Sequence, residues 1–137
     1  MSLPNLDNLG KTGQLKVEPM NQLKFSGLLR SGEARLHDAA NPSLAAESQF
    51  DLAYNAAHSL SLAALRWHGY RSGNRYLVFQ VLPHTIGVGP EGWRVLAKCH
   101  DCRTVAEYEG YFEIDEQLLK DLLTATQILL ARVRSLK

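Results

Sequence analysis

The feature that most constrains this 137-residue chain is a single long stretch, residues 43–70, with neither proline nor glycine before Gly69. The stretch is rich in alanine and leucine, which favour helices. Apolar side chains recur at steps of three or four residues from Phe50 to Trp67, and other apolar residues widen this stripe. Such breadth is typical of a central helix with neighbours on more than one side. The stretch therefore predicts a long, largely buried helix.

Three further segments, residues 19–37, 93–109 and 115–136, carry helical periodicity. The last is the cleanest, because its leucines repeat on one face and its charges suit the helix dipole. Residues 76–82 are strand-like by propensity, but no second such run exists to pair with them. They are therefore predicted to form a short helix.

The remaining segments predict helix boundaries and irregular structure. Asn41 is expected to cap a helix that begins at Pro42. Residues 87–92 are expected to form a loop, and residues 1–18 an irregular N-terminal arm. The predicted architecture is an all-α, four- or five-helix up-and-down bundle over residues 19–137.

Composition excludes little. Fifteen basic and fourteen acidic side chains give a formal charge of +1, so no overall field attracts nucleic acid or an anionic membrane. No apolar run approaches the roughly 20 residues that cross a bilayer. We therefore expect a cytoplasmic protein with no membrane partner.

Common catalytic and metal-binding patterns are absent from the sequence. Cys99 and Cys102 have the spacing of zinc and redox sites, but there is no second cysteine pair. We expect two free thiols, no metal and no cofactor. Phosphate-binding glycine loops and hydrolase elbows are also missing.

The long helix carries one candidate binding cluster. Asp51, Tyr54 and His58 lie at i, i+3 and i+7, so they share a face. Titratable groups on an otherwise apolar helix indicate a candidate site. The alternative is that Tyr54 packs in the core while the other two side chains are solvated.

The segment 93–109 carries a second cluster on neighbouring turns, formed by His100, Arg103, Thr104, Glu107 and Tyr108. An arginine here is suited to hold a phosphate with two hydrogen bonds. The alternative is a simple exposed ion pair between Arg103 and Glu107.

Three segments resemble HEPN domains, a family named for higher eukaryotes and prokaryotes nucleotide-binding. They read FDLAYNAAH at residues 50–58, GYR at 69–71 and RTVAEYEG at 103–110, in matching order over about residues 20–136. The resemblance implies a HEPN-like helical bundle that binds RNA or a nucleotide, or that acts in a toxin–antitoxin-like unit. The implied partners are an antitoxin or a nucleotidyltransferase-like protein. The implied binding residues are Asp51, Tyr54, His58, Arg71 and Glu107.

An alternative that the resemblance implies is a metal-independent ribonuclease. Active members share an arginine followed, after four to six residues, by a histidine. Arg103 matches the arginine, while Thr104 stands where asparagine is usual and Tyr108 falls at the histidine spacing. Arg94 and His100 satisfy the spacing literally. The candidate catalytic residues are therefore Arg103 with His100 or Tyr108; a further alternative is a purely structural, partner-binding module.

A homodimer is also expected, built from the long helix and the Arg103 helix. The long helix is apolar around more of its circumference than a small bundle usually covers. HEPN sites commonly form where two protomers meet. The alternative is a monomer in which other segments cover this surface.

Overall fold

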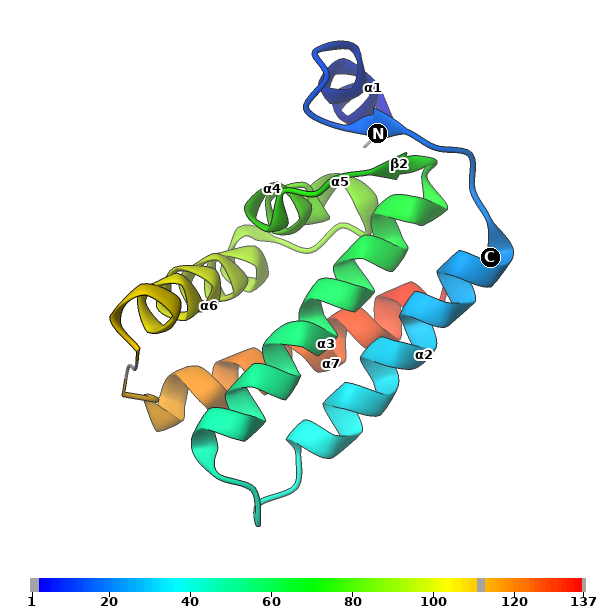
Figure 1. Ribbon diagram of the computed structural model, residues 1–137. Helices are drawn as coiled ribbons and strands as arrows, with labels where there is room; N and C mark the ends of the chain where they lie inside the picture. Colours follow the sequence, from blue (N-terminus) through cyan, green and yellow to red (C-terminus); the bar gives the residue numbers. More distant parts are fainter. Residues whose placement is uncertain (1–2, 111–112, 137) are drawn as a thin grey trace.

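The structure is a computed structural model that describes residues 3–110 and 113–136. These residues form seven helices and two short strands (Figure 1). The helices are α1 (Leu3–Lys11), α2 (Gln22–Ala39), α3 (Ala46–Trp67), α4 (Arg75–Gln80), α5 (Leu82–Thr85), α6 (Pro90–Glu109) and α7 (Glu116–Arg134); the strands are β1 (Lys16–Val17) and β2 (Tyr70–Arg71). The predicted all-α class is confirmed, but the described residues form seven helices instead of four or five, because α1 was not predicted and the one short helix predicted near residues 76–82 is divided into α4 and α5.

Helix α3 is the centre of the molecule, as its breadth predicts. It contacts α2, α7, α4, α5, α6 and β2 (Figure 1). Its alanines permit close approach, and α2 contributes Gly32, where a Cβ atom would lie 2.6 Å from Cγ of Leu60. Because neighbours within the same chain take up the apolar surface of α3, its breadth is explained without a second protomer.

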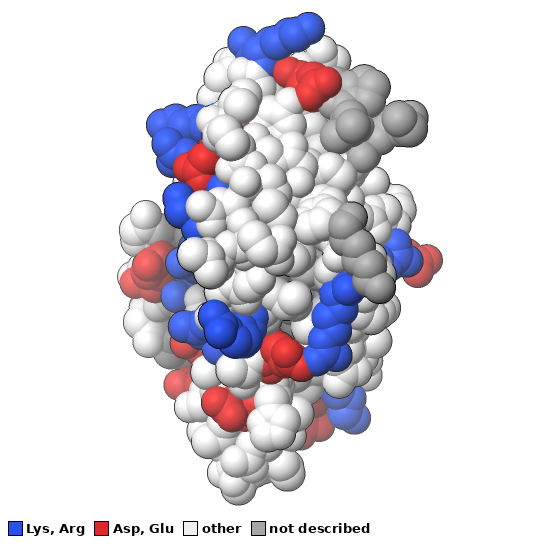
Figure 2. Space-filling view, turned by 90° about the vertical axis from the view of Figure 1, so that its right-hand side faces the viewer, with Lys and Arg blue, Asp and Glu red and all other residues white. Residues whose placement is uncertain are grey.

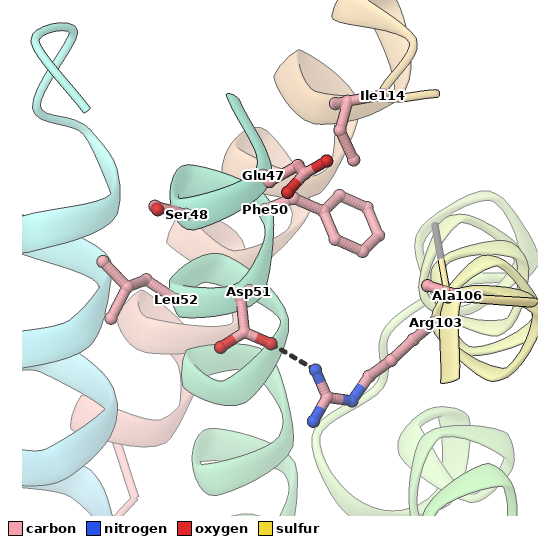
Figure 3. Close-up of a pocket in the computed structure, with 9 residues that line it drawn as sticks. Glu47, Ser48, Phe50, Asp51, Leu52, Arg103, Ala106 and Ile114 are labelled. Carbon is pink, nitrogen blue, oxygen red and sulfur yellow. Dashed lines mark hydrogen bonds and ion pairs between the residues drawn. The ribbon is translucent and has the colours of Figure 1, made fainter. Parts of the chain in front are cut away.

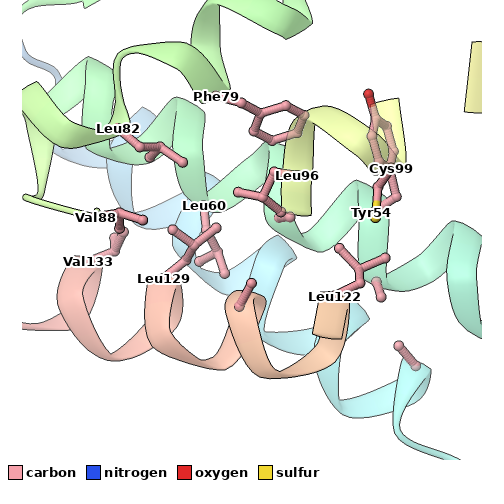
Figure 4. Packing of buried hydrophobic residues seen from close by; sticks show 14 of the residues in the cluster. Tyr54, Leu60, Phe79, Leu82, Val88, Leu96, Cys99, Leu122, Leu129 and Val133 are labelled. Atoms are coloured by element: carbon pink, nitrogen blue, oxygen red, sulfur yellow. The ribbon is translucent and has the colours of Figure 1, made fainter. Parts of the chain in front are cut away.

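The main core lies between α3, α6 and α7, with α2 and α4 closing its sides. Figure 4 shows Leu60 of α3, Leu96 of α6 and Leu122 of α7 facing one another. All three are fully buried, as is Tyr54. Tyr54 is therefore held rigidly, with its hydroxyl at the α6 side of the core (Figure 4).

The expectation of an irregular arm over residues 1–18 is wrong for the described part of that segment. It forms α1 and then β1, which pairs antiparallel with β2. Leu6 and Leu15 are buried in a second, small apolar cluster with Leu65, Tyr70, Val78 and Val81. These distant contacts order a segment whose local sequence favours irregular structure.

An ion-pair cluster links this N-terminal segment to α3. The Arg66 side chain, only 6% exposed, pairs with the Glu18 carboxylate. It also donates to the backbone carbonyls of Glu18 and Pro19, at 3.1 and 3.2 Å. Lys24 and Arg71 approach the same carboxylate from solvent, at 3.4 and 3.2 Å.

Several boundaries differ from prediction. Asn41 does not cap a helix at Pro42: its side chain accepts hydrogen bonds from the Ser43 amide and hydroxyl, closing a turn, and α3 begins at Ala46. The predicted loop over 87–92 ends early, because Pro90 occupies the first turn of α6. The short helix predicted over 76–82 is confirmed as α4 and the start of α5.

The surface carries mixed charge on the side formed by α2. Figure 2 shows lysine and arginine side chains interspersed with acidic ones around broad uncharged areas. No helix among residues 3–110 and 113–136 is long and apolar enough to cross a membrane. Any charge-based recognition must therefore come from a local cluster.

Candidate functional site

Helices α3 and α6 bring the two predicted clusters together. A cavity of about 200 Å³ opens between them and the start of α4, lined by Tyr54, Arg75, His100, Arg103, Thr104 and Glu107. Five of these six residues, all except Arg75, belong to the two clusters predicted from the sequence. The structure thus joins residues from three separate segments of the chain.

Tyr54 forms the base of this cavity. Its hydroxyl oxygen lies 3.1 Å from Nδ1 of His100, within hydrogen-bond distance. The Tyr76 ring packs on the other side of His100, with centroids 5.7 Å apart. Burial raises the pKa of Tyr54, although the charges of Arg75 and Arg103 oppose the rise. Tyr54 is therefore a neutral phenol that fixes the orientation of His100.

Two guanidinium groups flank the Tyr54 ring. The central carbon of Arg103 lies 5.1 Å from the ring centroid, and that of Arg75 lies 5.9 Å from it. Both distances fall within the range of cation–π attraction. The ring thus holds two positive groups close together, and a guanidinium carries five N–H donors, more than these contacts use.

Arg103 pairs with Asp51 across the gap between α6 and α3, through Nη1 and Oδ1 (Figure 3). The predicted alternative, an Arg103–Glu107 pair, is not formed. The Arg103 side chain remains 34% exposed, and Asp51 is its only carboxylate partner among the described residues. Other donors on the guanidinium therefore remain available.

Arg75 is the residue that sequence reasoning missed. It begins α4, directly after Asn74, whose side chain caps the helix by accepting from the Leu77 amide. It forms no ion pair with any residue that the structure describes. In the sequence it is a lone cation before a strand-like run. Its proximity to Tyr54 arises from the packing of α4 against α3, which the local sequence does not reveal.

His58 lies one turn beyond Tyr54 on α3, beside the cavity. Its ring meets Phe79 edge-on, with centroids 6.1 Å apart. Burial, followed by repulsion from Arg75, Arg103 and His100, lowers the pKa of His58 to about 4. His58 is therefore neutral at physiological pH and reports the positive charge of the site.

Two predicted site residues lie elsewhere. Tyr108 is 82% exposed and does not line the cavity. Arg71 lies in β2, where it contacts Glu18 beside Arg66. Arg94, the other arginine of the literal motif spacing, is exposed near the start of α6 and lines a different cavity. Among the proposed catalytic pairings, only Arg103 with His100 shares the cavity.

The cysteines lie on α6 outside the cavity lining. Both are free thiols. Burial raises the pKa of Cys99 to about 12, and burial also raises the pKa of Cys102. Neither is an activated nucleophile. Within the described ranges, no group of three or more His, Cys, Asp or Glu side chains is placed to hold a metal ion.

Comparisons with known proteins provide no relative. No family model, no curated protein and no solved structure matches this chain. Function is therefore inferred from the cavity and the residues that line it.

Proposed function

We propose that this chain is a HEPN-like, up-and-down helical bundle that binds the phosphate of RNA or of a nucleotide in the cavity between α3, α4 and α6. The observation that carries the proposal is the pair of guanidiniums, Arg75 and Arg103, that lie near the one buried Tyr54 ring. The lining holds these two arginines and one carboxylate, Glu107, while Asp51 pairs with Arg103 and leaves Arg75 without an ion pair among the described residues.

The size of the cavity supports a phosphate. About 200 Å³ admits a small anion but not a whole nucleotide. Arginine binds phosphate with two parallel N–H donors. The Thr104 hydroxyl, also at the wall, already donates its proton to the His100 carbonyl at 3.0 Å, so the two arginines are the groups that recognise the anion. A phosphate carried on a larger molecule fits this arrangement, with the remainder of the ligand outside the cavity.

Calorimetric titration with ribose 5-phosphate and with a single-stranded RNA octamer tests the proposal. Arg75→Gln and Arg103→Gln each lose a charge-assisted hydrogen bond, so each is expected to weaken binding by about tenfold or more. Arg94→Gln, an exposed arginine of α6 outside the cavity, is the matched control. Unchanged affinity in both cavity variants would contradict the proposal.

A second candidate is metal-independent ribonuclease activity, favoured by the placement of His100 beside Arg103. Tyr54 and Tyr76 contact the imidazole, and a positioned imidazole can serve as a general acid or base. RNA cleavage is expected to persist in EDTA, to vanish in His100→Ala and Arg103→Gln, and to survive in Tyr108→Phe. Cleavage that requires a divalent metal would exclude this mechanism.

We also propose a homodimer, whose interface is formed by α6 more than by α3. Val105 and Tyr108 are large apolar residues of α6 that are 49% and 82% exposed. Small-angle scattering over a dilution series separates the alternatives. A compact monomer has a radius of gyration of roughly 14 Å, and a compact dimer roughly 19 Å.

A further inference from the structure

A wider cavity adjoins the proposed phosphate site, and Arg103 lines both. It measures about 500 Å³, which is within the usual range for small-molecule pockets. In Figure 3, Asp51 and Arg103 lie at its lower edge, Ala106 of α6 at its right and Ile114 at its top. A ligand with its phosphate in the small cavity therefore has room for its remaining part beside it.

Glu47 gives this wider cavity its chemistry. It is an exposed residue in the first turn of α3 and lies beside Phe50, on the side of the cavity where Ile114 lies (Figure 3). Asp51 already pairs with Arg103, whereas Glu47 has no hydrogen bond or ion pair with the part of the chain that the structure describes. The wide cavity thus offers one uncommitted carboxylate, which accepts hydrogen bonds and donates none.

Among the nucleobases, one edge fits a carboxylate best. Guanine presents two adjacent donors, N1–H and the 2-amino group, which match the two oxygens of a carboxylate. Adenine and cytosine each place an acceptor next to their amino donor, and uracil places its one N–H between two acceptors. A carboxylate repels those acceptors, so it selects guanine.

We propose that the wide cavity is a base subsite for a guanosine phosphate, with Glu47 accepting from the guanine edge while Arg75 and Arg103 hold the phosphate. This inference rests on the proposed phosphate site. The same chemistry is supplied by free GMP or by a guanosine within single-stranded RNA. The test therefore includes both sources.

Calorimetric titrations with GMP, AMP and ribose 5-phosphate separate the two subsites. GMP is expected to bind about tenfold more tightly than AMP, as one charge-assisted hydrogen bond provides. Glu47→Gln is expected to weaken GMP binding about tenfold and leave ribose 5-phosphate binding unchanged. A glutamine amide pairs with adenine, so the same variant narrows the preference for GMP over AMP.

Glu91→Gln is the matched control, because Glu91 lies in the first turn of α6 as Glu47 lies in that of α3, and it lines a different cavity. It is expected to leave all three affinities unchanged. An adenosine octamer with one central guanosine, compared with its inosine counterpart, shows whether RNA supplies the base. A preference for guanosine in either the free nucleotide or the octamer supports the proposal.

The failures are distinguishable. Equal affinity for GMP, AMP and ribose 5-phosphate, lost in Arg103→Gln, would overturn the base subsite and leave the phosphate site intact. Absence of binding by all three ligands and by both octamers would overturn the base subsite and the phosphate site together.

Discussion

Two arginines of this molecule, Arg66 in the last turn of α3 and Arg103 of α6, are in opposite circumstances. Arg66 is buried, and its donors meet the Glu18 carboxylate and the carbonyls of Glu18 and Pro19. Arg103 is one-third exposed, meets Asp51 and stacks on Tyr54 beside two cavities. A guanidinium whose donors are saturated by its own chain stabilises the fold, whereas one with spare donors in a cavity is available to a ligand.

The largest expected effect is on stability, at Arg66. Arg66→Ala leaves Glu18 and two carbonyls without their buried donor, so we expect a loss of about 3 kcal/mol in the free energy of unfolding. That loss corresponds to a fall in Tm of roughly 10 °C. Arg71→Ala, an exposed partner of the same carboxylate, is the control and is expected to cost under about 1 kcal/mol. Equal losses in thermal unfolding would remove the distinction between the two arginines.

The second-largest expected effect is on the pH dependence of the free energy of unfolding, through His58. Its pKa in the folded state, about 4, lies below the ordinary 6.5, so the folded state binds fewer protons than the unfolded chain in this interval. His58 therefore contributes its full stability above pH 6.5 and loses it as the pH falls toward 4. We expect a loss on the order of 2 kcal/mol by urea unfolding, and a flatter profile in His58→Gln.

The pKa of His58 also distinguishes an arginine that lines the cavity, Arg75, from one that lies outside it, Arg71. Because Arg75 and Arg103 repel a proton on His58, Arg75→Gln is expected to raise its pKa in an NMR titration. Arg71 lies in β2, beyond the C-terminal end of α3, so Arg71→Gln is expected to leave the His58 pKa unchanged. An unchanged His58 pKa in Arg75→Gln would contradict a contribution from the Arg75 charge.

The smallest effect is on the stability of Arg103 variants. Its one ion pair is partly exposed, so Arg103→Gln is expected to change the free energy of unfolding by less than about 1 kcal/mol. Thermal unfolding of this variant beside Arg66→Ala measures the contrast directly. A Tm loss as large as that of Arg66→Ala would identify Arg103 as a structural residue.

The central part of the fold follows from local sequence. Helical periodicity predicted α2, α3, α6 and α7. The lack of a second strand-like run led to the correct prediction that residues 76–82 are helical. The N-terminal segment escaped prediction because Leu6 and Leu15 are ordered by Tyr70 and Val78, which lie far along the chain. Local helix propensity does not reveal contacts between segments that are distant in the sequence.

The site was predictable where its residues share a helix face. Asp51 and Tyr54 on α3, and His100 and Arg103 on α6, were singled out by spacing and meet in space. Arg75 was missed because its position depends on how α4 packs. Arg71 was misplaced because a short segment does not reveal that Glu18 binds it.

The small apolar cluster beneath the N-terminal segment has a consequence for ligand binding at a distance. Val78 and Val81 belong both to this cluster and to the short helical region that begins with Arg75. The packing of Leu6 and Leu15 therefore helps to set where a guanidinium of the cavity stands, although neither leucine lines it. Loosening this cluster would move one wall of the cavity relative to the other, so the anion binding proposed for the cavity would depend on residues that no ligand touches.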